Sequence, residues 1–560
     1  MATVTHPPAA QTGGGFLISN TEPAAVFTPE DFTEEHKAIA KTAREFFANE
    51  VAPNLDKILH HEPGVAVAAL RKSAELGLTS ITIPEAYGGL GLDLATAMIA
   101  GEQLSGDGSY AGWHGAHTGI GTLPIVYFGT EGQKRKYLPK LATAEMIAAY
   151  ALTEPHAGSD ALAARTRADL NPEGTHYILN GQKMWITNGG AADLITVFAK
   201  INGEQFTAFL VERGFGGVTS GAEEKKMGIK GSSTTALYLD NVRVPVENVL
   251  GEIGRGHIIA FNILNIGRLK LGAFTIGGAK QVLAESIKYA KNRVAFGHPI
   301  AEFGAIRHKL AEMALRIYAT ESMVWRTVGM IAPNESLKTI EEFAIECSII
   351  KVFASEMLDY VVDEGVQIHG GYGYHQDYAV ERAYRDSRIN RIFEGTNEIN
   401  RLLIPGMLFK RAMRGQIPLV AAAKKAMTDI EPADLVTNAK KIALMAMGVA
   451  YQRHLTALEQ QQEILMSIAD IIMEAYAMES VQLRSQKCRH SPALADVILR
   501  DGMARIEIAA RNVIAACSEG DTMRTYLAIL KRYAKYEPVD AIAARRAIAE
   551  RLLSMSRYAV

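Results

Sequence analysis

Hydrophobic and polar residues follow different rules in successive parts of the chain. From about residue 33 to 140 apolar positions recur at helical spacing, as in TEEHKAIAKTAREFFANEV, which opens with a threonine cap and early acids. From about residue 150 the segments become short and rich in β-branched and aromatic residues, as in HYILNGQKMWITN and TTALYLDNVRVP, with Gly, Asn and Asp between them. This second pattern predicts an antiparallel sheet or barrel.

Beyond Gly254 the helical spacing returns in longer runs. One predicted helix carries a buried stripe at steps of four, three and four, formed by Ile306, Leu310, Met313 and Ile317. Residues 411–560 are rich in Ala, Met, Lys and Arg with almost no strand pattern, so a further helical bundle is expected. The order of helix, strand and helix predicts a mainly α-helical protein with a central β domain and argues against a doubly wound α/β fold.

The changes of pattern predict five segments. In chain order we expect a flexible N-terminal segment (1–29), an N-terminal helical domain (30–149), a middle β-barrel domain (150–253), a second helical domain (254–410) and a C-terminal helical extension (411–560). The first segment begins MATVTHPPAAQTGGG, a composition typical of disorder. One face of residues 466–483 is apolar enough to dock on a membrane surface, although a buried seam within a bundle or dimer fits the pattern better.

Composition and charge narrow the class of protein. The 560 residues carry a formal charge of -2 and are 48% hydrophobic, which is ordinary for a globular enzyme and gives no reason to expect nucleic acid as a partner. No GxGxxG follows a strand and no phosphate-binding P-loop is present, which argues against a nicotinamide or nucleotide site of those types. His114 and His117 are spaced as in ordinary packing, so no metal is expected.

The cysteines and the N-terminus predict the compartment. Cys347, Cys488 and Cys517 are far apart and form no CxxC pair, which favours reduced thiols in a reducing environment. The first Lys or Arg is Lys37, so we expect neither the basic region of a secretory signal nor the Arg-rich face of a transit peptide. We therefore expect a bacterial cytoplasmic protein, with peripheral membrane contact through the extension as an alternative.

The stretch RIFEGTNEINR (391–401) is the strongest candidate for chemistry. Gly395 loosens the backbone, Thr396 or Asn397 caps a helix, and Glu398 lies in its first turn. Glu394 is then either a solvated carboxylate, which the local residues alone favour, or a carboxylate held beside apolar neighbours so that it can take a proton.

Four stretches in this order resemble the acyl-CoA dehydrogenase family: YALTEPHAGSD (150–160), MWITNGG (184–190), NRVAFG (292–297) with QIHGGYGY (367–374), and RIFEGTNEINR. The segment ILNIGRLKLGAF and the helical extension are most similar to the very-long-chain branch. The resemblance implies an N-terminal helical domain, a middle β-barrel and a C-terminal helical bundle that binds flavin and substrate, plus the extra helical domain. It also implies FAD-dependent oxidation of long-chain fatty acyl-CoA to trans-2-enoyl-CoA, the first oxidative step of fatty acid β-oxidation, with electrons passed to an electron-transfer flavoprotein.

The resemblance also assigns the FAD contacts. They are Tyr150, Leu152, Thr153, Trp185, Ile186, Thr187, Arg293, Phe296, Gln367, Gly370, Gly371, Thr396 and Glu398. In the family, the groups matching Arg293 and the glycine-rich turn reach the FAD of a neighbouring subunit, so at least a homodimer is expected. Without the motifs, Trp185 is equally well a core residue of the barrel, Thr153 a turn residue and Arg293 a solvated cation. His369 departs from the family pattern.

For the reaction, Glu394 matches the family base, which takes the pro-R α-proton while the β-hydrogen leaves as hydride to the flavin. We expect this carboxylate to be partly solvated until a bound acyl chain raises its pKa. Some family members carry the base just before the residue matching Arg268. That position is Gly267 here, so Glu394 is the only base that the pattern offers. The implied substrate contacts are Ser159, Asn265, Arg268 and Gly395.

Four glycines in YAGWHGAHTGIG bear on chain length. Small residues there would deepen an acyl cavity, although helix packing explains them equally well; they are Gly112, Gly115, Gly119 and Gly121. An acyl-CoA oxidase that uses oxygen, or a scaffold or assembly protein that has kept the fold without the chemistry, are the alternative functions.

Overall fold

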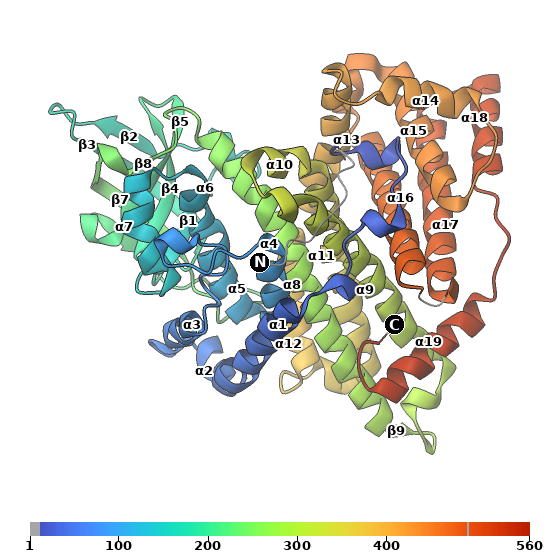
Figure 1. Ribbon diagram of the computed structural model, residues 1–560, viewed down its shortest axis with the longest axis horizontal. Helices are drawn as coiled ribbons and strands as arrows, with labels where there is room; N and C mark the ends of the chain where they lie inside the picture. Colours follow the sequence, from blue (N-terminus) through green and yellow to red (C-terminus); the bar gives the residue numbers. More distant parts are fainter. Residues whose placement is uncertain (1–11, 490–491, 560) are drawn as a thin grey trace.

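The computed structural model describes residues 12–489 and 492–559 (Figure 1). The N-terminal helical domain is capped as the sequence predicts: Thr33 Oγ1 accepts the backbone N–H of His36 at 3.2 Å at the start of the first helix. A π-helical turn, His117–Gly121, continues α5. The helices are α1 (Glu34–Phe46), α2 (Leu55–Leu59), α3 (Val65–Glu75), α4 (Leu94–Leu104), α5 (Gly108–Ala116), α6 (Leu123–Phe128) and α7 (Glu131–Ala142).

The middle of the chain forms one eight-stranded sheet in the order β6-β7-β3-β2-β4-β5-β8, with β1 also paired to β4. Most neighbours are antiparallel, as predicted, but β1 and β2 both run parallel to β4. The strands are β1 (Ala148–Ala151), β2 (Arg167–Leu170), β3 (His176–Thr187), β4 (Leu194–Ile201), β5 (Gln205–Glu212), β6 (Val218–Ser220), β7 (Thr234–Pro245) and β8 (Val249–Leu250).

The second helical domain is built on α8, which is long and apolar enough to span a membrane by length and composition. Because 72% of its most apolar window is buried inside the protein, it serves as a core helix. The predicted stripe on α9 faces the core, with Leu310, Met313 and Ile317 buried. The elements are α8 (Gly256–Asn292), β9 (Val294–Ala295), β10 (His298–Pro299), α9 (Gly304–Ile331), α10 (Leu337–Glu342), α11 (Ala344–His369), α12 (Ala379–Ser387) and α13 (Asn397–Met413).

The C-terminal extension is a helical bundle, as expected, drawn in orange and red in Figure 1. Residues 466–483 lie in α16, and their apolar side chains, among them Ile468, Ile471 and Ile472, are buried against neighbouring helices. That face is therefore not available to a membrane, and the membrane-docking interpretation of this helix is wrong. The helices are α14 (Leu419–Thr428), α15 (Leu435–His454), α16 (Gln462–Cys488), α17 (Pro492–Cys517), α18 (Gly520–Tyr533) and α19 (Ala541–Met555).

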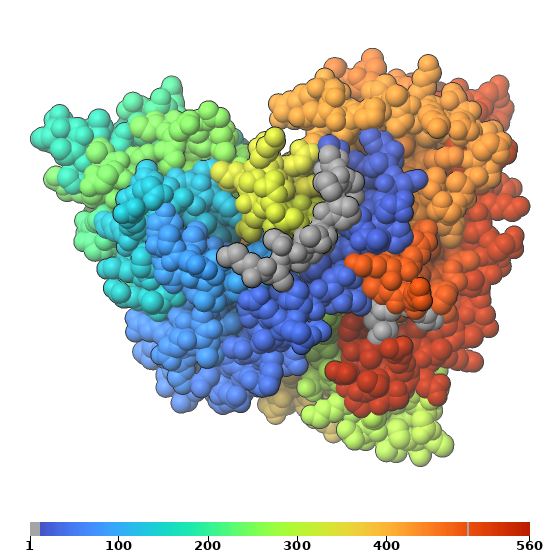
Figure 2. Space-filling model, in the orientation of Figure 1, coloured from blue at the N-terminus to red at the C-terminus, as the bar shows by residue number. Residues whose placement is uncertain are grey.

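The prediction that residues 1–29 are flexible is wrong for residues 12–29, while residues 1–11 lie outside the described part. The backbone N–H groups of Gly13 and Gly14 donate to the carboxylates of Glu342 and Glu346 at 2.8 and 2.7 Å. Phe16, Leu17, Val26 and Phe27 are buried. Figure 2 shows this dark blue segment lying between the second helical domain and the extension. A few apolar anchors and two acids far away in sequence therefore order a segment whose own composition suggested disorder.

Candidate active site

The turn before α13 is built as the sequence predicted. Thr396 Oγ1 accepts the N–H of Ile399 at 3.2 Å and so caps the helix. Asn400 Nδ2 donates back to the carbonyls of Gly395 and Thr396 at 2.8 and 3.1 Å. Glu394 and Gly395 both adopt positive φ, 58° and 80°. A non-glycine residue in this region is strained, so the surrounding contacts must hold Glu394 in place.

Two buried cations anchor the turn from below. Arg268 Nε donates to the carbonyl of Glu394 at 3.1 Å, and its Nη1 donates to Asn265 Oδ1 at 3.0 Å. Lys351 Nζ donates to Asn397 Oδ1 at 2.7 Å. Arg268 and Asn265 thus fix the backbone of the turn, and neither lines the large cavity described below. Their predicted contact with substrate stays a prediction.

The glycine just before Arg268 makes room for the carboxylate. A Cβ atom on Gly267 would lie 2.7 Å from Glu394 Oε2 and 2.9 Å from both Cδ and Oε1. Carbon and oxygen atoms do not approach this closely without displacement. The position that lacks an acid in the sequence is therefore the position against which the Glu394 carboxylate rests.

Glu394 is set up to carry a proton. The residue as a whole is half-buried, yet its Oε2 atom is buried and has no hydrogen-bond partner within the described residues. Burial raises its pKa to about 7, against the lowering effect of the nearby Arg268 and Lys351 charges. Glu394 is partly exposed, as expected, but it is not an ordinary solvated acid, because the rise in its pKa that we expected from substrate binding is already present in the protein alone.

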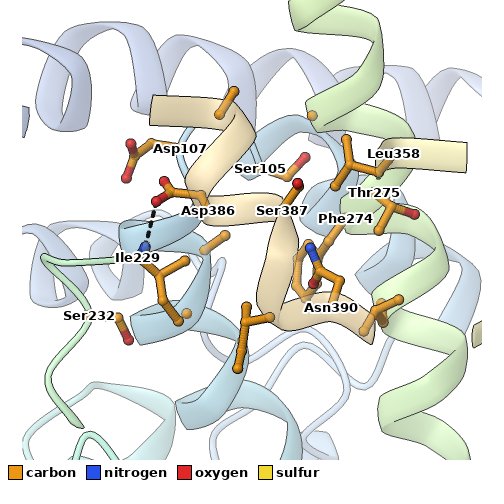
Figure 3. Close-up of a pocket in the computed structure, with 18 of the residues that line it drawn as sticks. Ser105, Asp107, Ile229, Ser232, Phe274, Thr275, Leu358, Asp386, Ser387 and Asn390 are labelled. Atoms are coloured by element: carbon orange, nitrogen blue, oxygen red, sulfur yellow. Dashed lines mark hydrogen bonds between the residues drawn. The ribbon is translucent and has the colours of Figure 1, made fainter. Parts of the chain in front are cut away.

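A cavity of about 1450 Å³, part of it open to solvent, extends from Glu394 between α5, α8 and α12. In Figure 3, Phe274, Thr275 and Leu358 line one side, and Ile229 and Ser232 line the other. Most of its wall is apolar, and its far end carries Asp107 and Asp386. Burial and the neighbouring Asp107 raise the pKa of Asp386 to about 7, and this carboxyl accepts the N–H of Ile229.

Three of the four glycines singled out in the sequence line this cavity. Added Cβ atoms on Gly112, Gly115 and Gly119 would meet Ser232 Oγ at 2.7 Å, Phe274 Cε2 at 3.1 Å and Lys270 Nζ at 3.4 Å, respectively. Gly121 instead packs against the sheet, where its Cβ would lie 2.6 Å from that of Ala148. Because Gly119 faces Lys270 and Gly115 faces Phe274, α5 and α8 run antiparallel along the cavity.

On the sheet side, Trp185 and Thr187 come from the end of β3. A bulge between Lys183 and Ile186 shifts the register, and Trp185 has φ 58° and a side chain that is 60% exposed. The barrel-core interpretation of Trp185 is therefore wrong, whereas Ile186 does point into the core. Thr187 lines the cavity together with Glu394.

The remaining predicted groups near β1 are partly engaged with the protein itself. The carbonyl of Leu152 accepts Lys183 Nζ at 3.3 Å, and the carbonyl of Thr153 accepts the N–H of Met184 at 2.9 Å. The Tyr150 hydroxyl is buried without a partner within the described residues. Burial, reinforced by the nearby Glu394, raises the pKa of Tyr150 well above its usual value.

An ion pair beneath this surface escaped the sequence analysis. Lys183 is fully buried in β3, and its Nζ lies 2.6 Å from Glu154 Oε1. Glu154 also accepts the N–H groups of Arg165 and Thr166 at 2.6 and 3.1 Å. The only sign of this ion pair in the sequence is a lysine at a position of the strand that alternation places on the buried face. Alternation alone does not show whether such a lysine is buried or whether a change of register turns it to the exposed face.

The other predicted cofactor residues lie together but far from Glu394. Arg293 and Phe296 are exposed on the β9–β10 hairpin, and Gln367, Gly370 and Gly371 are exposed at the end of α11. The Arg293 guanidinium lies 5.6 Å from the ring centroid of Tyr372. Helix α8 runs from Gly267 to this cluster, and 26 helical residues span about 39 Å. One chain therefore does not bring both clusters to the same dinucleotide.

Three other predicted residues have simpler surroundings. His369, the departure from the family pattern, stacks on Tyr289 with ring centroids 4.1 Å apart, and its Nδ1 bonds the carbonyl of Gly365 at 2.7 Å. Ser159 and Glu398 are exposed.

The described residues contain no cluster of His, Cys, Asp or Glu suited to a metal ion, and the three cysteines are free thiols.

The groups around the cavity suit a flat aromatic cofactor. Trp185 offers an exposed ring beside Thr187, and the buried Tyr150 hydroxyl lacks a partner. An exposed aromatic ring two residues before a cavity-lining threonine suits an isoalloxazine ring, which needs an aromatic neighbour and oriented polar groups.

Comparisons with known proteins identify the class. Residues 33–145, 149–242 and 254–407 match family models described as the N-terminal, middle and C-terminal domains of acyl-CoA dehydrogenase. Residues 438–532 match a second model described as an acyl-CoA dehydrogenase C-terminal domain. These matches, with the site, define an FAD-dependent oxidoreductase. The chain belongs to the acyl-CoA dehydrogenase family.

Individual relatives agree with this assignment. A protein of Bacillus subtilis (strain 168) described as "Probable acyl-CoA dehydrogenase" is 48% identical, with 98% of this chain and 99% of that protein covered. The crystal structure of an acyl-CoA dehydrogenase complexed with FAD from Bacillus anthracis has a TM-score of 0.96 at 50% identity, covering 98% of this chain and all of that one. The mitochondrial very long-chain specific acyl-CoA dehydrogenase of Bos taurus is 45% identical over 67% of this chain and 58% of its own length.

Proposed function

We propose that this acyl-CoA dehydrogenase oxidises long-chain fatty acyl-CoA to trans-2-enoyl-CoA, as the first oxidative step of fatty acid β-oxidation, and passes the electrons to an electron-transfer flavoprotein. The observation that carries the proposal is the Glu394 carboxylate, resting on Gly267 at one end of a long, mainly apolar cavity. The bovine relative, which acts on very long chains by its name, supports the choice of chain length.

The residues of the chain divide the chemistry between them. Glu394 takes the proton from the carbon next to the thioester carbonyl, and its pKa of about 7 places it close to the working pH of a base. Arg268 and Asn400 hold the backbone of the turn, so that the carboxylate has one position relative to the substrate. When bound, FAD supplies the acceptor for the β-hydrogen. Trp185 and Thr187 are the groups that would hold its ring, on the sheet side of the cavity.

The length of the cavity supports a long acyl chain. Lining residues of α8 extend from Gly267 to Glu285, which is about 27 Å along the helix axis. The three lining glycines of α5 and the π turn remove side chains from the opposite wall. Apolar walls of this length bind an extended alkyl chain through the hydrophobic effect.

The second cluster supports a homodimer. Phe296 is 93% exposed with φ 53°, and Arg293 extends from the same hairpin, which projects at the lower edge of Figure 1. A large exposed aromatic beside a cation indicates a surface made for a partner. We expect the hairpin to reach the FAD of a second copy. Light scattering after gel filtration should give the wild-type protein the mass of a dimer or a larger oligomer. Arg293→Met should lower the FAD content, measured by flavin absorbance, at unchanged secondary structure. A wild-type monomer with full FAD would contradict the proposal.

Anaerobic titration tests the activity itself. We expect the yellow purified protein to bleach on addition of palmitoyl-CoA, and to bleach less with butyryl-CoA. Reoxidation by an electron-transfer flavoprotein, but not by oxygen at a comparable rate, supports a dehydrogenase; fast reoxidation by oxygen indicates an oxidase. A colourless protein that takes up no FAD would indicate a scaffold.

A further inference from the structure

A buried lysine lies on the wall of the acyl cavity, although an alkyl chain has no group that could accept a hydrogen bond from its ammonium group. Lys270 follows Gly267 by one helical turn of α8, is only 8% exposed and lines the same cavity as Glu394. Its Nζ makes one long hydrogen bond, to Thr118 Oγ1 at 3.4 Å, and no ion pair with a carboxylate in the described part of the chain.

The surroundings of this ammonium group leave it poorly satisfied. A lysine ammonium has three N–H donors, and a single long bond leaves two of them free to bond a group in the cavity. Burial lowers the pKa of Lys270 to about 8, against the raising effect of Glu335. Buried polar groups in proteins are normally hydrogen-bonded, because an unpaired one costs free energy. An acceptor within the cavity would remove that cost.

The lysine side chain lies against the opposite wall of the cavity. A Cβ atom on Gly119 would make ordinary contacts with Lys270, 3.4 Å from its Nζ and 3.8 Å from its Cδ, so the lysine side chain lies directly opposite this glycine. The cavity continues beyond Lys270 to Phe274, Gly278 and Gln281. A long acyl chain therefore passes the ammonium group and does not end at it.

The distance from the base indicates which carbons pass the lysine. Glu394 rests on Gly267, and three residues of helix advance about 4.5 Å towards the far end of the cavity. Lys270 thus meets the acyl chain a few carbons beyond the reacting pair.

We propose that Lys270 is a specificity residue that binds an oxygen substituent, a hydroxyl or carbonyl group, on the proximal part of the acyl chain. This inference rests on the proposed function. The enzyme then prefers a long-chain acyl-CoA that carries an oxygen on the proximal part of its chain to the same chain with its oxygen at the far end. A terminal carboxylate fits less well, because the cavity does not close at the lysine.

The test compares substrates that differ only in one oxygen. The probes are palmitoyl-CoA, palmitoyl-CoA with a hydroxyl on the sixth carbon, and palmitoyl-CoA with a hydroxyl on the last carbon. The readout is kcat/KM, taken as the ratio of each hydroxylated substrate to palmitoyl-CoA. Hydrogen bonds to charged groups contribute about 1.5–3 kcal/mol, so Lys270→Met should lower the ratio for the sixth-carbon substrate by about 10-fold or more. The ratio for the terminal hydroxyl should not change.

Two further variants separate a specific contact from a general change of the wall. Leu271→Met alters the neighbouring lining residue without adding or removing a donor, and should leave both ratios as in the wild type. Lys270→Gln keeps an N–H donor and should restore part of the lost ratio; it also decides the matter if Lys270→Met does not fold. Equal ratios in wild type, Lys270→Met and Lys270→Gln would overturn the inference. If none of the three substrates bleaches the wild-type flavin, the proposed function fails instead.

Discussion

Replacing Gly267 by alanine tests the contact on which the position of the base depends. The added methyl carbon would lie 2.7 Å from Glu394 Oε2, whereas ordinary contacts begin at 3.4 Å, so the carboxylate must move by about 0.7 Å. Since the atoms that move are the end of a flexible side chain, folding is not impaired. Alanine also favours the helix by about 1 kcal/mol relative to glycine. We therefore expect equal or higher stability together with slower chemistry.

Single-turnover bleaching of the flavin, under anaerobic conditions and with saturating palmitoyl-CoA, measures this chemistry without product release. A displacement approaching 1 Å in a reacting group costs up to about 100-fold in rate, so we expect a loss of about 10- to 100-fold in Gly267→Ala.

Gly278→Ala is the matched control for this variant. It adds a methyl group to the same helix and the same cavity, yet its nearest neighbours, Leu358 Cδ1 and the Ser105 carbonyl, are both 3.7 Å away. Its rate of bleaching should stay within a few-fold of wild type. Bleaching by Gly267→Ala at the rate of this control would refute the reasoning.

Three other perturbations test neighbouring parts of the site. Because burial raises the pKa of Glu394 to about 7 and only the carboxylate accepts a proton, kcat/KM should rise with pH through about 7; a flat profile between pH 5.5 and 8.5 contradicts this. Lys183→Met leaves the buried Glu154 without its cation and should destabilise the FAD-loaded protein by about 3–5 kcal/mol, whereas adding Glu154→Gln should restore part of the melting temperature; equal melting of the two variants argues against the ion pair. Arg268→Met removes the hydrogen bond to the Glu394 carbonyl and should slow bleaching of the flavin even at temperatures where the variant is fully folded. An unchanged bleaching rate would contradict this expectation.

The sequence predicted those features that depend on local pattern. The helix–sheet–helix order and the cap at Thr396 follow from hydrophobic spacing and from the chemistry of helix starts. The order of the elements and the cap are properties of short segments, and short segments determine them. The resemblance to the family, and not local pattern, implied that Glu394 and Thr187 belong to one site, and both line one cavity.

The features that sequence analysis missed depend on contacts between distant segments. Residues 12–29 are ordered by Glu342 and Glu346, which lie more than 300 positions away. The exposure of Trp185 depends on a bulge in the pairing of β3 with β7, which alternation does not reveal. The pKa of Glu394 was expected to rise only with substrate, yet the packing of α8 against the turn already buries its Oε2 atom.

The central claim is that Glu394 is the base, and Glu394→Gln tests it most directly. The amide has nearly the same shape and cannot accept the α-proton as a base. We predict that the variant retains FAD and still binds palmitoyl-CoA, seen as a shift of the flavin spectrum, while anaerobic bleaching slows by about 10²- to 10⁴-fold. Bleaching within a few-fold of the wild-type rate would contradict the account.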